Sequence, residues 1–245
     1  MNVQTSRASA SWARWAMIPV VIAATGSLLY FRAHATQILS APILAQPFLD
    51  ENVKYQLITL ALTALVLLAT YLTGPASFRR FFHWGQINAP VTPVKAIGIN
   101  PGPNENWLQV GRNFALIITG VTAVFIYLQA IRGNRIAPEH LHLLPWILIL
   151  SLSNSFVEEM ITRFAVVSSL DGMLPPGAVY LISAAIFGGV HYFGTPGGIP
   201  GVLMAGFLGW FAAKSIGETR GVFWAWLIHF LQDVVIFTGF FFLNL

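Results

Sequence analysis

The sequence contains no cysteine and few charged residues, and each of these absences excludes whole classes of protein. Without cysteine, the chain has no disulfide framework, no thiol nucleophile and no cysteine-ligated zinc site. Charged residues make up 9% of the 245 residues, against about 25% in a typical soluble domain. So few charges cannot solvate a soluble surface, and a chain that is 56% hydrophobic is not of the disordered class. The 13 basic residues form no stripe, so we expect no nucleic-acid partner.

Apolar runs that could cross a membrane recur along the chain. A spanning helix needs about 20 mostly apolar residues. Seven stretches approach or reach this length: Trp12–Tyr30, Tyr55–Leu72, Asn113–Ala130, Leu143–Leu170, Val179–Tyr192, Gly201–Ile216 and Phe223–Phe242. We therefore expect an all-α, polytopic transmembrane helix bundle of about seven spans. The range is six to eight, because the fourth stretch is long, carries charges and could be two elements.

The one substantial polar segment, Thr73–Arg112, contains five prolines and lies among the N-terminal spans. We predict N-terminal transmembrane helices over residues 1–142, with this loop between them, and a separate core over residues 143–245. With seven spans, nine Lys and Arg residues lie on the side of the N-terminus and four on the other side. This excess favours a cytoplasmic N-terminus, because positive residues concentrate in cytoplasmic loops.

The first stretch has a second interpretation. Arg7 and Arg14, an apolar run and then Ala33-His34-Ala35 are typical of a signal peptide with a small-residue cleavage site. However, the run is longer than a usual signal-peptide core, and Pro19 lies early in it. We therefore favour a retained transmembrane helix.

Six ionisable residues lie within the apolar stretches or at their edges, all in the C-terminal half. They are Glu158, Glu159, Arg163, His191, His229 and Asp233. A charged residue at the centre of a span costs about 2.5–3.5 kcal/mol on insertion scales. We therefore expect these side chains to face the interior of the bundle or a wet cavity, and to pair with one another.

Helical spacing predicts which of these side chains can meet. Glu159 and Arg163 are four residues apart with the acid first, which is the favourable order for an ion pair. Glu158 is turned by about 100° from Glu159 and has no expected partner on its own helix. One carboxylate would thus be neutralised and the other available. His229 and Asp233 are also four residues apart, so we expect the aspartate to orient the imidazole.

Two further patterns concern packing. Gly188 and Gly189 precede His191 and would let another backbone or a substrate come close. Small residues recur every fourth position along the sixth stretch, and we expect them to bring the helices of His191 and His229 together. These residues are Gly201, Ala205, Gly209, Ala213 and Gly217. The aromatic residues near the C-terminus are interpreted as lipid-facing or interfacial surface; they are Phe237, Phe240, Phe241 and Phe242.

The ionisable set suits hydrolysis by an activated water. A carboxylate beside a neutral histidine can deprotonate a water held between them, and a second histidine can stabilise the oxyanion that forms. Serine nucleophile elbows, H-E-x-x-H and phosphate-binding loops are absent from the sequence. No cofactor is firmly implied. Histidines and carboxylates also bind zinc, so a divalent-metal version stays open and the spacing assigns no metal ligand.

Three motifs in order resemble the CPBP intramembrane endopeptidases, which include the CAAX prenyl endopeptidase and the bacterial Abi proteins. Glu158–Arg163 matches E-E-x-x-x-R, Phe187–His191 matches F-x-x-x-H, and His229–Asp233 matches H-x-x-x-[N/D]. The resemblance covers roughly Leu143–Phe242. It implies an eight-helix-like α bundle and a membrane-associated or lipidated peptide or protein substrate. It also suggests a bacterial plasma (inner) membrane location.

The resemblance further implies the role of each site residue. Glu158 and His191 would activate the water, and His229 and Asp233 would be catalytic at the oxyanion. Glu159, Arg163 and Phe187 would support the site. The best-known members carry Asn where this chain has Asp233, and an ionised Asp would repel an oxyanion. We therefore prefer an orienting role for Asp233, through His229.

Two other functions compete with the protease. The same acids and histidines could relay protons in a transporter, although no inverted repeat is visible in the sequence. A non-catalytic immunity or partner membrane protein is the third reading. Cleavage activity that depends on Glu158 separates the protease from both.

Overall fold

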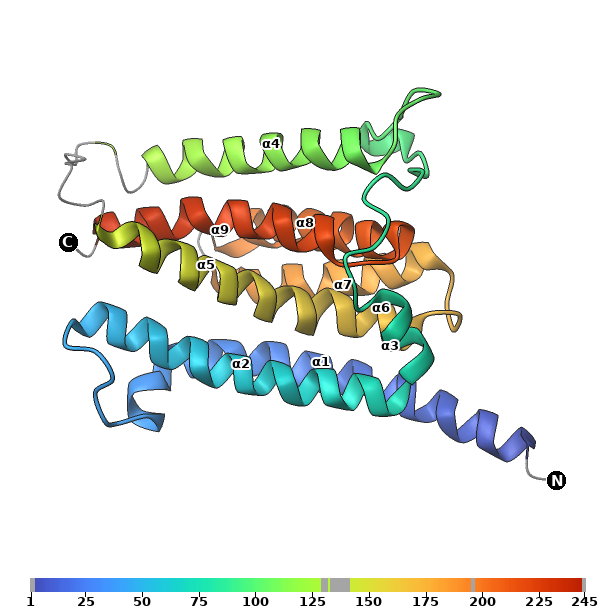
Figure 1. Ribbon diagram of the computed structural model, residues 1–245, viewed down its shortest axis with the longest axis horizontal. Coiled ribbons are helices and arrows are strands. Elements are labelled where there is room, and N and C mark those ends of the chain that lie inside the picture. The colour runs from blue at the N-terminus through green and yellow to red at the C-terminus, as the bar shows by residue number, and fades with distance from the viewer. Residues whose placement is uncertain (1–2, 129–131, 133–141, 195–196, 244–245) are drawn as a thin grey trace.

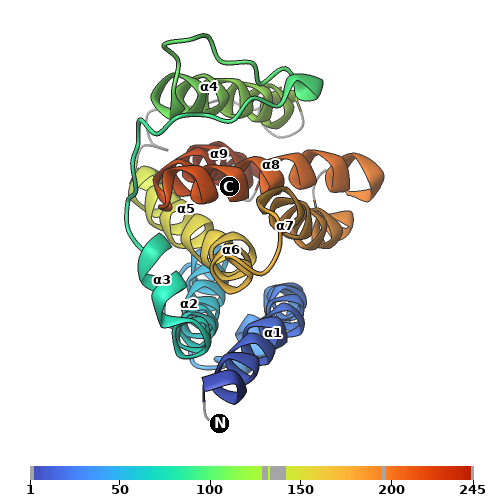
Figure 2. The same ribbon diagram turned by 90° about the vertical axis from the view of Figure 1, so that its right-hand side faces the viewer.

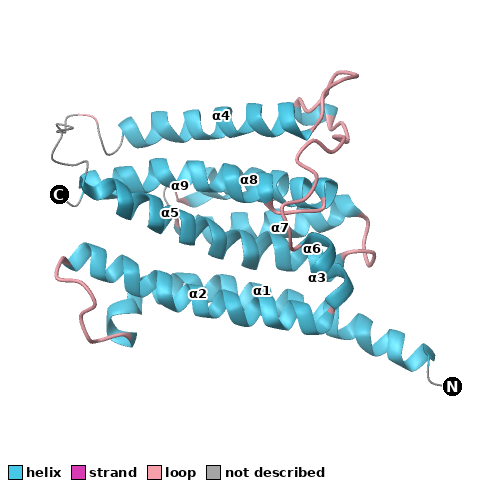
Figure 3. Ribbon diagram, viewed as in Figure 1, coloured by secondary structure: helices cyan, strands magenta, loops and turns pink. Residues whose placement is uncertain are grey.

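The computed structural model describes residues 3–128, 132, 142–194 and 197–243, and these residues form helices and loops without a strand. The helices are α1 (Val3–Ile38), α2 (Pro47–Thr73), α3 (Pro75–Phe81), α4 (Trp107–Ile126), α5 (Leu144–Glu159), α6 (Ala165–Leu170), α7 (Pro176–Val190), α8 (Gly198–Thr219) and α9 (Phe223–Leu243). Figure 3 shows this all-helical composition, with the loops at the two ends of the bundle.

Seven of the described helical segments are long and apolar enough to cross a membrane, which confirms the predicted all-α polytopic bundle. The predicted ends were less accurate, because hydropathy alone misses polar first turns. α2 begins at Pro47 rather than Tyr55. Asp50 and Lys54, four residues apart, form an ion pair of 2.7 Å, and this pairing allows both charges to lie inside the helix.

The helices are arranged in layers (Figure 1). α1 and α2 lie side by side on one face and α4 lies on the opposite face. Between them lie α5, α7, α8 and α9, and Figure 2 shows these layers end-on. α1 also packs against α6 and α7 through buried residues such as Met17 and Val21. The helix continues through residues 33–35 without a break. Retention of this helix in the mature protein stays a prediction.

The long fourth stretch is one membrane-spanning segment, Leu144–Leu170, with a π-helical turn in its middle. α5 ends at Glu159, the π turn covers Met160–Phe164, and α6 follows without a gap. π turns inside α-helices are rare and often occur at functional sites. Here the turn directly follows the paired glutamates of the sequence motif.

Small residues permit close contact between α7, which carries His191, and α8, whereas the sequence analysis expects them to bring α7 together with α9, the helix of His229. A Cβ atom on Gly188 would lie 2.7 Å from the carbonyl oxygen of Val202, and one on Gly209 would lie 3.2 Å from the Cβ of Phe187. A Cβ on Gly189 would have nothing within 4 Å. Of the two glycines before His191, only Gly188 is therefore required by the helix contact.

The proline-rich segment is less irregular than predicted. It contains α3, and α4 begins at Trp107 because Asn106 and Gln109 form a capping box at its start. The part before α4 is bonded to the α8–α9 turn: Gln86 N–H donates to Thr219 O (2.8 Å), and Trp224 Nε1 donates to Ile87 O (2.8 Å). The loop is thus a fixed cap on one end of the bundle.

The aromatic run near the C-terminus does not face lipid throughout, and this prediction was wrong for two of its residues. Phe237 and Phe241 are buried in a small apolar cluster with Leu49 and Ile147. Phe48 packs edge-on against Phe241, with ring centroids 5.1 Å apart. α2 and α5 cover this face of α9, and composition alone does not reveal such a neighbour.

Candidate active site

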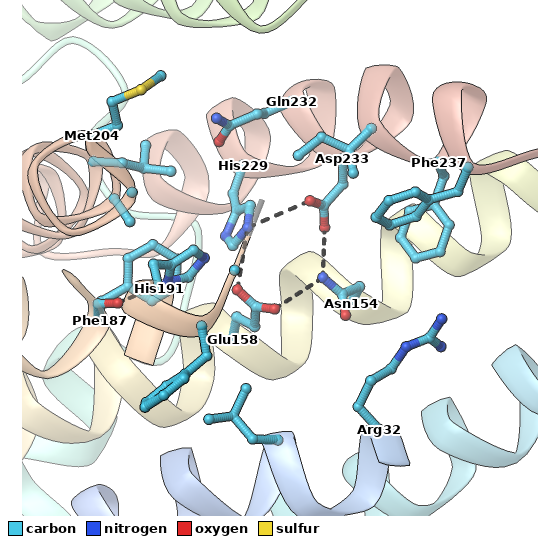
Figure 4. A pocket seen from close by; sticks show the side chains of 18 of the residues that line it. Arg32, Asn154, Glu158, Phe187, His191, Met204, His229, Gln232, Asp233 and Phe237 are labelled. Atoms are coloured by element: carbon cyan, nitrogen blue, oxygen red, sulfur yellow. Dashed lines mark hydrogen bonds and ion pairs between the residues drawn. The ribbon is translucent and has the colours of Figure 1, made fainter. Parts of the chain in front are cut away.

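A cavity of about 350 Å³ lies within the bundle, and six helices contribute to its lining (Figure 4). Glu158, His191, His229 and Asp233 all border it. They come from α5, the end of α7 and α9, so the three sequence motifs meet at one place. α1 and α2, which lie outside these motifs, contribute Leu29, Arg32, Asn52 and Tyr55.

Glu158 is the carboxylate that the cavity exposes. Its side chain is 18% accessible, whereas that of Glu159 is completely buried. Glu158 Oε1 accepts a hydrogen bond of 3.1 Å from Asn154 Nδ2, and Oε2 lies 3.5 Å from His229 Nε2. The prediction that Glu158 lacks a partner on its own helix was wrong, because Asn154 lies one turn earlier on α5.

Glu159 and Arg163 form the predicted ion pair behind the cavity wall. Arg163 Nη1 lies 3.3 Å from Glu159 Oε1 and donates to Thr162 Oγ1 at 2.8 Å. The Arg163 guanidinium also stacks on the ring of Phe187, 3.3 Å from its centroid. Such cation–π contacts are stronger when both groups are desolvated, as here. The pair therefore fixes Phe187, and with it the turn of α7 that carries His191.

His229 is surrounded by three carboxylates. Its Nδ1 lies 2.7 Å from Glu159 Oε1, while Nε2 lies 3.5 Å from Glu158 Oε2 and 3.6 Å from Asp233 Oδ1. The sequence assigned the orienting acid to Asp233 from the i,i+4 spacing. The structure places Glu159 at hydrogen-bond distance instead, because α5 lies directly against α9. Nε2 is left facing the cavity (Figure 4).

Asp233 is held mainly by Asn154, a residue that the sequence analysis missed. Asn154 Nδ2 donates to Asp233 Oδ2 at 3.0 Å and also to Glu158 Oε1, so a single amide bridges two carboxylates. Gln56 Nε2 from α2 donates to Asn154 Oδ1 at 3.4 Å. The position of Asn154, four residues before Glu158 in an apolar run, is the signal that could have identified it.

His191 begins the short 3₁₀ turn that ends α7. Its Nδ1 lies 2.8 Å from the carbonyl oxygen of Phe187, and its ring lies 4.2 Å from the ring of Phe187. A carbonyl oxygen only accepts, so Nδ1 carries the proton and Nε2 of the neutral ring is the free acceptor. This arrangement gives the cavity a proton-accepting nitrogen.

The histidines and carboxylates of the site also bear on the question of a metal ion. Across the residues that the structure describes, no group of three or more His, Cys, Asp and Glu side chains is arranged to hold one. The divalent-metal version thus stays a prediction, and we derive no step through a metal.

Comparison with known proteins supports the sequence resemblance. Residues 140–235 match the model of the family described as Rce1-like, type II CAAX prenyl endopeptidase. No curated protein and no solved structure matches the chain. Together with the seven apolar helices, the match indicates an integral membrane protein and an intramembrane endopeptidase of the CAAX type. Residues 140–235 are therefore similar to the Rce1-like, type II CAAX prenyl endopeptidase family, which agrees with the resemblance to CPBP proteins that the three motifs indicate.

Proposed function

We propose that this protein hydrolyses a peptide bond of a membrane-associated peptide or protein, with a water activated by Glu158 and His191. The observation that carries this proposal is the contrast between the two adjacent glutamates. Glu159 is buried and bonded to Arg163 and His229, whereas Glu158 faces a cavity large enough for a short peptide segment. Glu159 thus has a structural role, and Glu158 is the carboxylate that a water in the cavity can reach.

The proposed reaction begins with a water in the cavity between Glu158 and His191. Glu158 takes a proton from the water, and the bare Nε2 of His191 accepts a hydrogen bond that holds its oxygen in place. The water oxygen then attacks the carbonyl carbon of the scissile bond. As the C–N bond breaks, Glu158 returns the proton to the departing nitrogen.

His229 is positioned to stabilise the oxyanion of the tetrahedral intermediate. Glu159 accepts from Nδ1 and so holds the ring, and Nε2 of the protonated ring donates toward the cavity. Asp233 does not contact the oxyanion directly in this scheme, since two negative charges would repel each other. We propose that it acts with Asn154 to fix the position of Glu158 and the charge around His229.

We also propose that the protein lies in a bacterial plasma membrane with its N-terminus in the cytoplasm. The nine-to-four distribution of Lys and Arg supports this orientation. The substrate would be a lipidated or otherwise membrane-associated peptide. It need not carry a prenyl group.

Purified protein in lipid nanodiscs, given a farnesylated CAAX peptide and its unprenylated counterpart, tests the function. Wild-type protein should cleave at least one of them, with mass spectrometry locating the cut. Glu158→Gln and His191→Ala should each lower the rate by about 10²-fold or more at unchanged melting temperature. Glu105→Gln, in a loop, and His34→Ala, which bonds only to its own helix turn, are the matched controls.

Full cleavage by Glu158→Gln would contradict the mechanism. Proton flux into liposomes without any cleavage would favour the transporter, and a phenotype unaffected by Glu158→Gln would favour a non-catalytic partner. The same assay with a chelator tests the zinc alternative, because a metal-dependent enzyme would lose activity that added zinc restores.

A further inference from the structure

Arg32 is a cation of the cavity that the proposed mechanism does not use. It lies on α1, outside the segment that matches the family, six positions before Ile38 at the end of the helix. Two cavities border Glu158 and His191, and Arg32 and Tyr55 line both of them. Figure 4 shows the Arg32 side chain entering the cavity on the side of Asn154 away from His191.

The surroundings of Arg32 leave most of its donors unused. Nη1 donates to Asn52 Oδ1 at 3.0 Å, and the guanidinium lies 5.6 Å from the centroid of the Tyr55 ring. The Asn52 amide is itself fixed, because its Nδ2 donates to Phe48 O at 2.7 Å. Within the described part of the chain, Arg32 forms no ion pair, although Glu158 and Asp233 line the same cavity.

A guanidinium has five N–H donors in a planar fork that matches a carboxylate. One donor is used here, and α2 holds that donor's partner rigidly. An arginine within a spanning helix is costly unless it finds a partner or reaches the interface. Arg32 therefore offers a pre-positioned anion site at one end of the cavity, with the hydrolytic groups bordering the same space.

The size of the cavity indicates which anion fits. At about 350 Å³ it lies at the small end of ligand pockets, so it holds a few residues of extended peptide rather than a folded segment. A peptide cut close to its end presents its terminal α-carboxylate within that reach.

We propose that Arg32, held by Asn52, binds the C-terminal carboxylate of the peptide substrate and so selects for cleavage near a free chain end. This inference rests on the proposed function. The bond is a charge-assisted hydrogen bond, so it should weaken when the carboxylate is replaced by a neutral amide. A lipid phosphate at Arg32 is the competing occupant that the test separates.

The experiment compares one farnesylated CAAX peptide bearing a free C-terminal carboxylate with the same peptide bearing a C-terminal amide. Wild-type protein should cleave the carboxylate form with a kcat/KM about tenfold or more higher. Arg32→Gln should cleave both at the rate of the amide form. Arg32→Lys should keep part of the preference. Arg79→Gln, an exposed arginine that bonds Tyr71, should keep all of it.

Equal cleavage of the two peptides by wild-type protein, or an undiminished preference in Arg32→Gln, would overturn the inference. An equal loss on both peptides in Arg32→Gln, dependent on anionic lipid in the nanodisc, would assign Arg32 to a lipid phosphate and overturn it too. A second measurement needs no catalysis: the binding of both peptides is compared between the Glu158→Gln variant and the Glu158→Gln, Arg32→Gln double variant. The inference thus stays testable if the proposed function fails.

Discussion

The ion pairs Glu159–Arg163 on α5 and its π turn and Lys214–Glu218 on α8 share the i,i+4 spacing but have different surroundings. Lys214 Nζ also donates to Thr92 O (2.8 Å), and Glu218 Oε2 accepts from Trp107 Nε1 (2.9 Å). This pair fastens the proline-rich loop to α8. Glu159 instead contacts His229, whose other nitrogen faces the cavity.

The comparison shows that spacing alone does not identify a functional pair. Both pairs are largely buried. Glu159–Arg163 has the favourable order, with the acid first, and Lys214–Glu218 has the reverse order. They differ in what their second partners do. The further partners of Lys214 and Glu218 are a backbone carbonyl of the proline-rich loop and the indole at the start of α4, whereas the further partner of Glu159 is a titratable ring at a cavity. Function follows from the contacts between helices.

Neutralising the acid of each pair should separate the two roles most strongly. Glu159→Gln should lower kcat by about 10²-fold, because His229 loses the charge that holds its ring. Glu218→Gln should leave kcat per folded molecule within about twofold, since its contacts lie at the loop. Each variant should also be destabilised by about 3–5 kcal/mol, because each leaves a buried cation unpaired. Rates at low temperature and thermal melts measure both effects, and similar kcat losses in both variants would contradict the comparison.

Asn154 offers a second and smaller test on the site side. Asn154→Leu removes the amide that bridges Glu158 and Asp233, so kcat should fall about 10- to 100-fold with little change in KM. Ser153→Ala, at the preceding position, is the control; its hydroxyl donates to Leu150 O within the same helix, so this variant should keep full activity. A rise in KM at constant kcat would show that Asn154 binds substrate rather than positioning the acids.

The helix contact that carries His191 should respond mainly in stability. Gly188→Ala places a Cβ against the backbone of α8 and should destabilise the protein by about 1–3 kcal/mol. Gly189→Ala meets open space and should be neutral or stabilising by up to about 1 kcal/mol, because alanine favours helix. Thermal unfolding in detergent measures the difference. Equal melting temperatures would mean that α7 and α8 can separate at no cost.

Much of the fold followed from local patterns. Apolar runs located all seven candidate spans, and the i,i+4 rule found the Glu159–Arg163 pair. The ends of helices were less predictable, because an ion pair near the start of α2 and a capping box at α4 extend helices into polar sequence. The predicted lipid exposure of Phe237 and Phe241 was wrong for a different reason, because the burial of a side chain depends on the neighbouring helices.

The candidate site divides in the same way. Glu158, His191, His229 and Asp233 were identified from motif spacing, and they border one cavity. Asn154, Arg32 and the pairing of His229 with Glu159 were not predictable, since each involves partners far apart in the sequence. Their roles in catalysis and binding stay predictions until the variants are measured.

By itself, the sequence determined that the chain is a membrane-embedded helix bundle and that its costly polar groups gather in the C-terminal half. Both properties follow from hydropathy and helical periodicity, which act over a few helical turns and do not depend on contacts between distant parts of the chain. Only the tertiary structure decided which carboxylate meets which imidazole and which acid faces the cavity. Those choices depend on the rotation and separation of α5, α7 and α9, which are set by packing between helices.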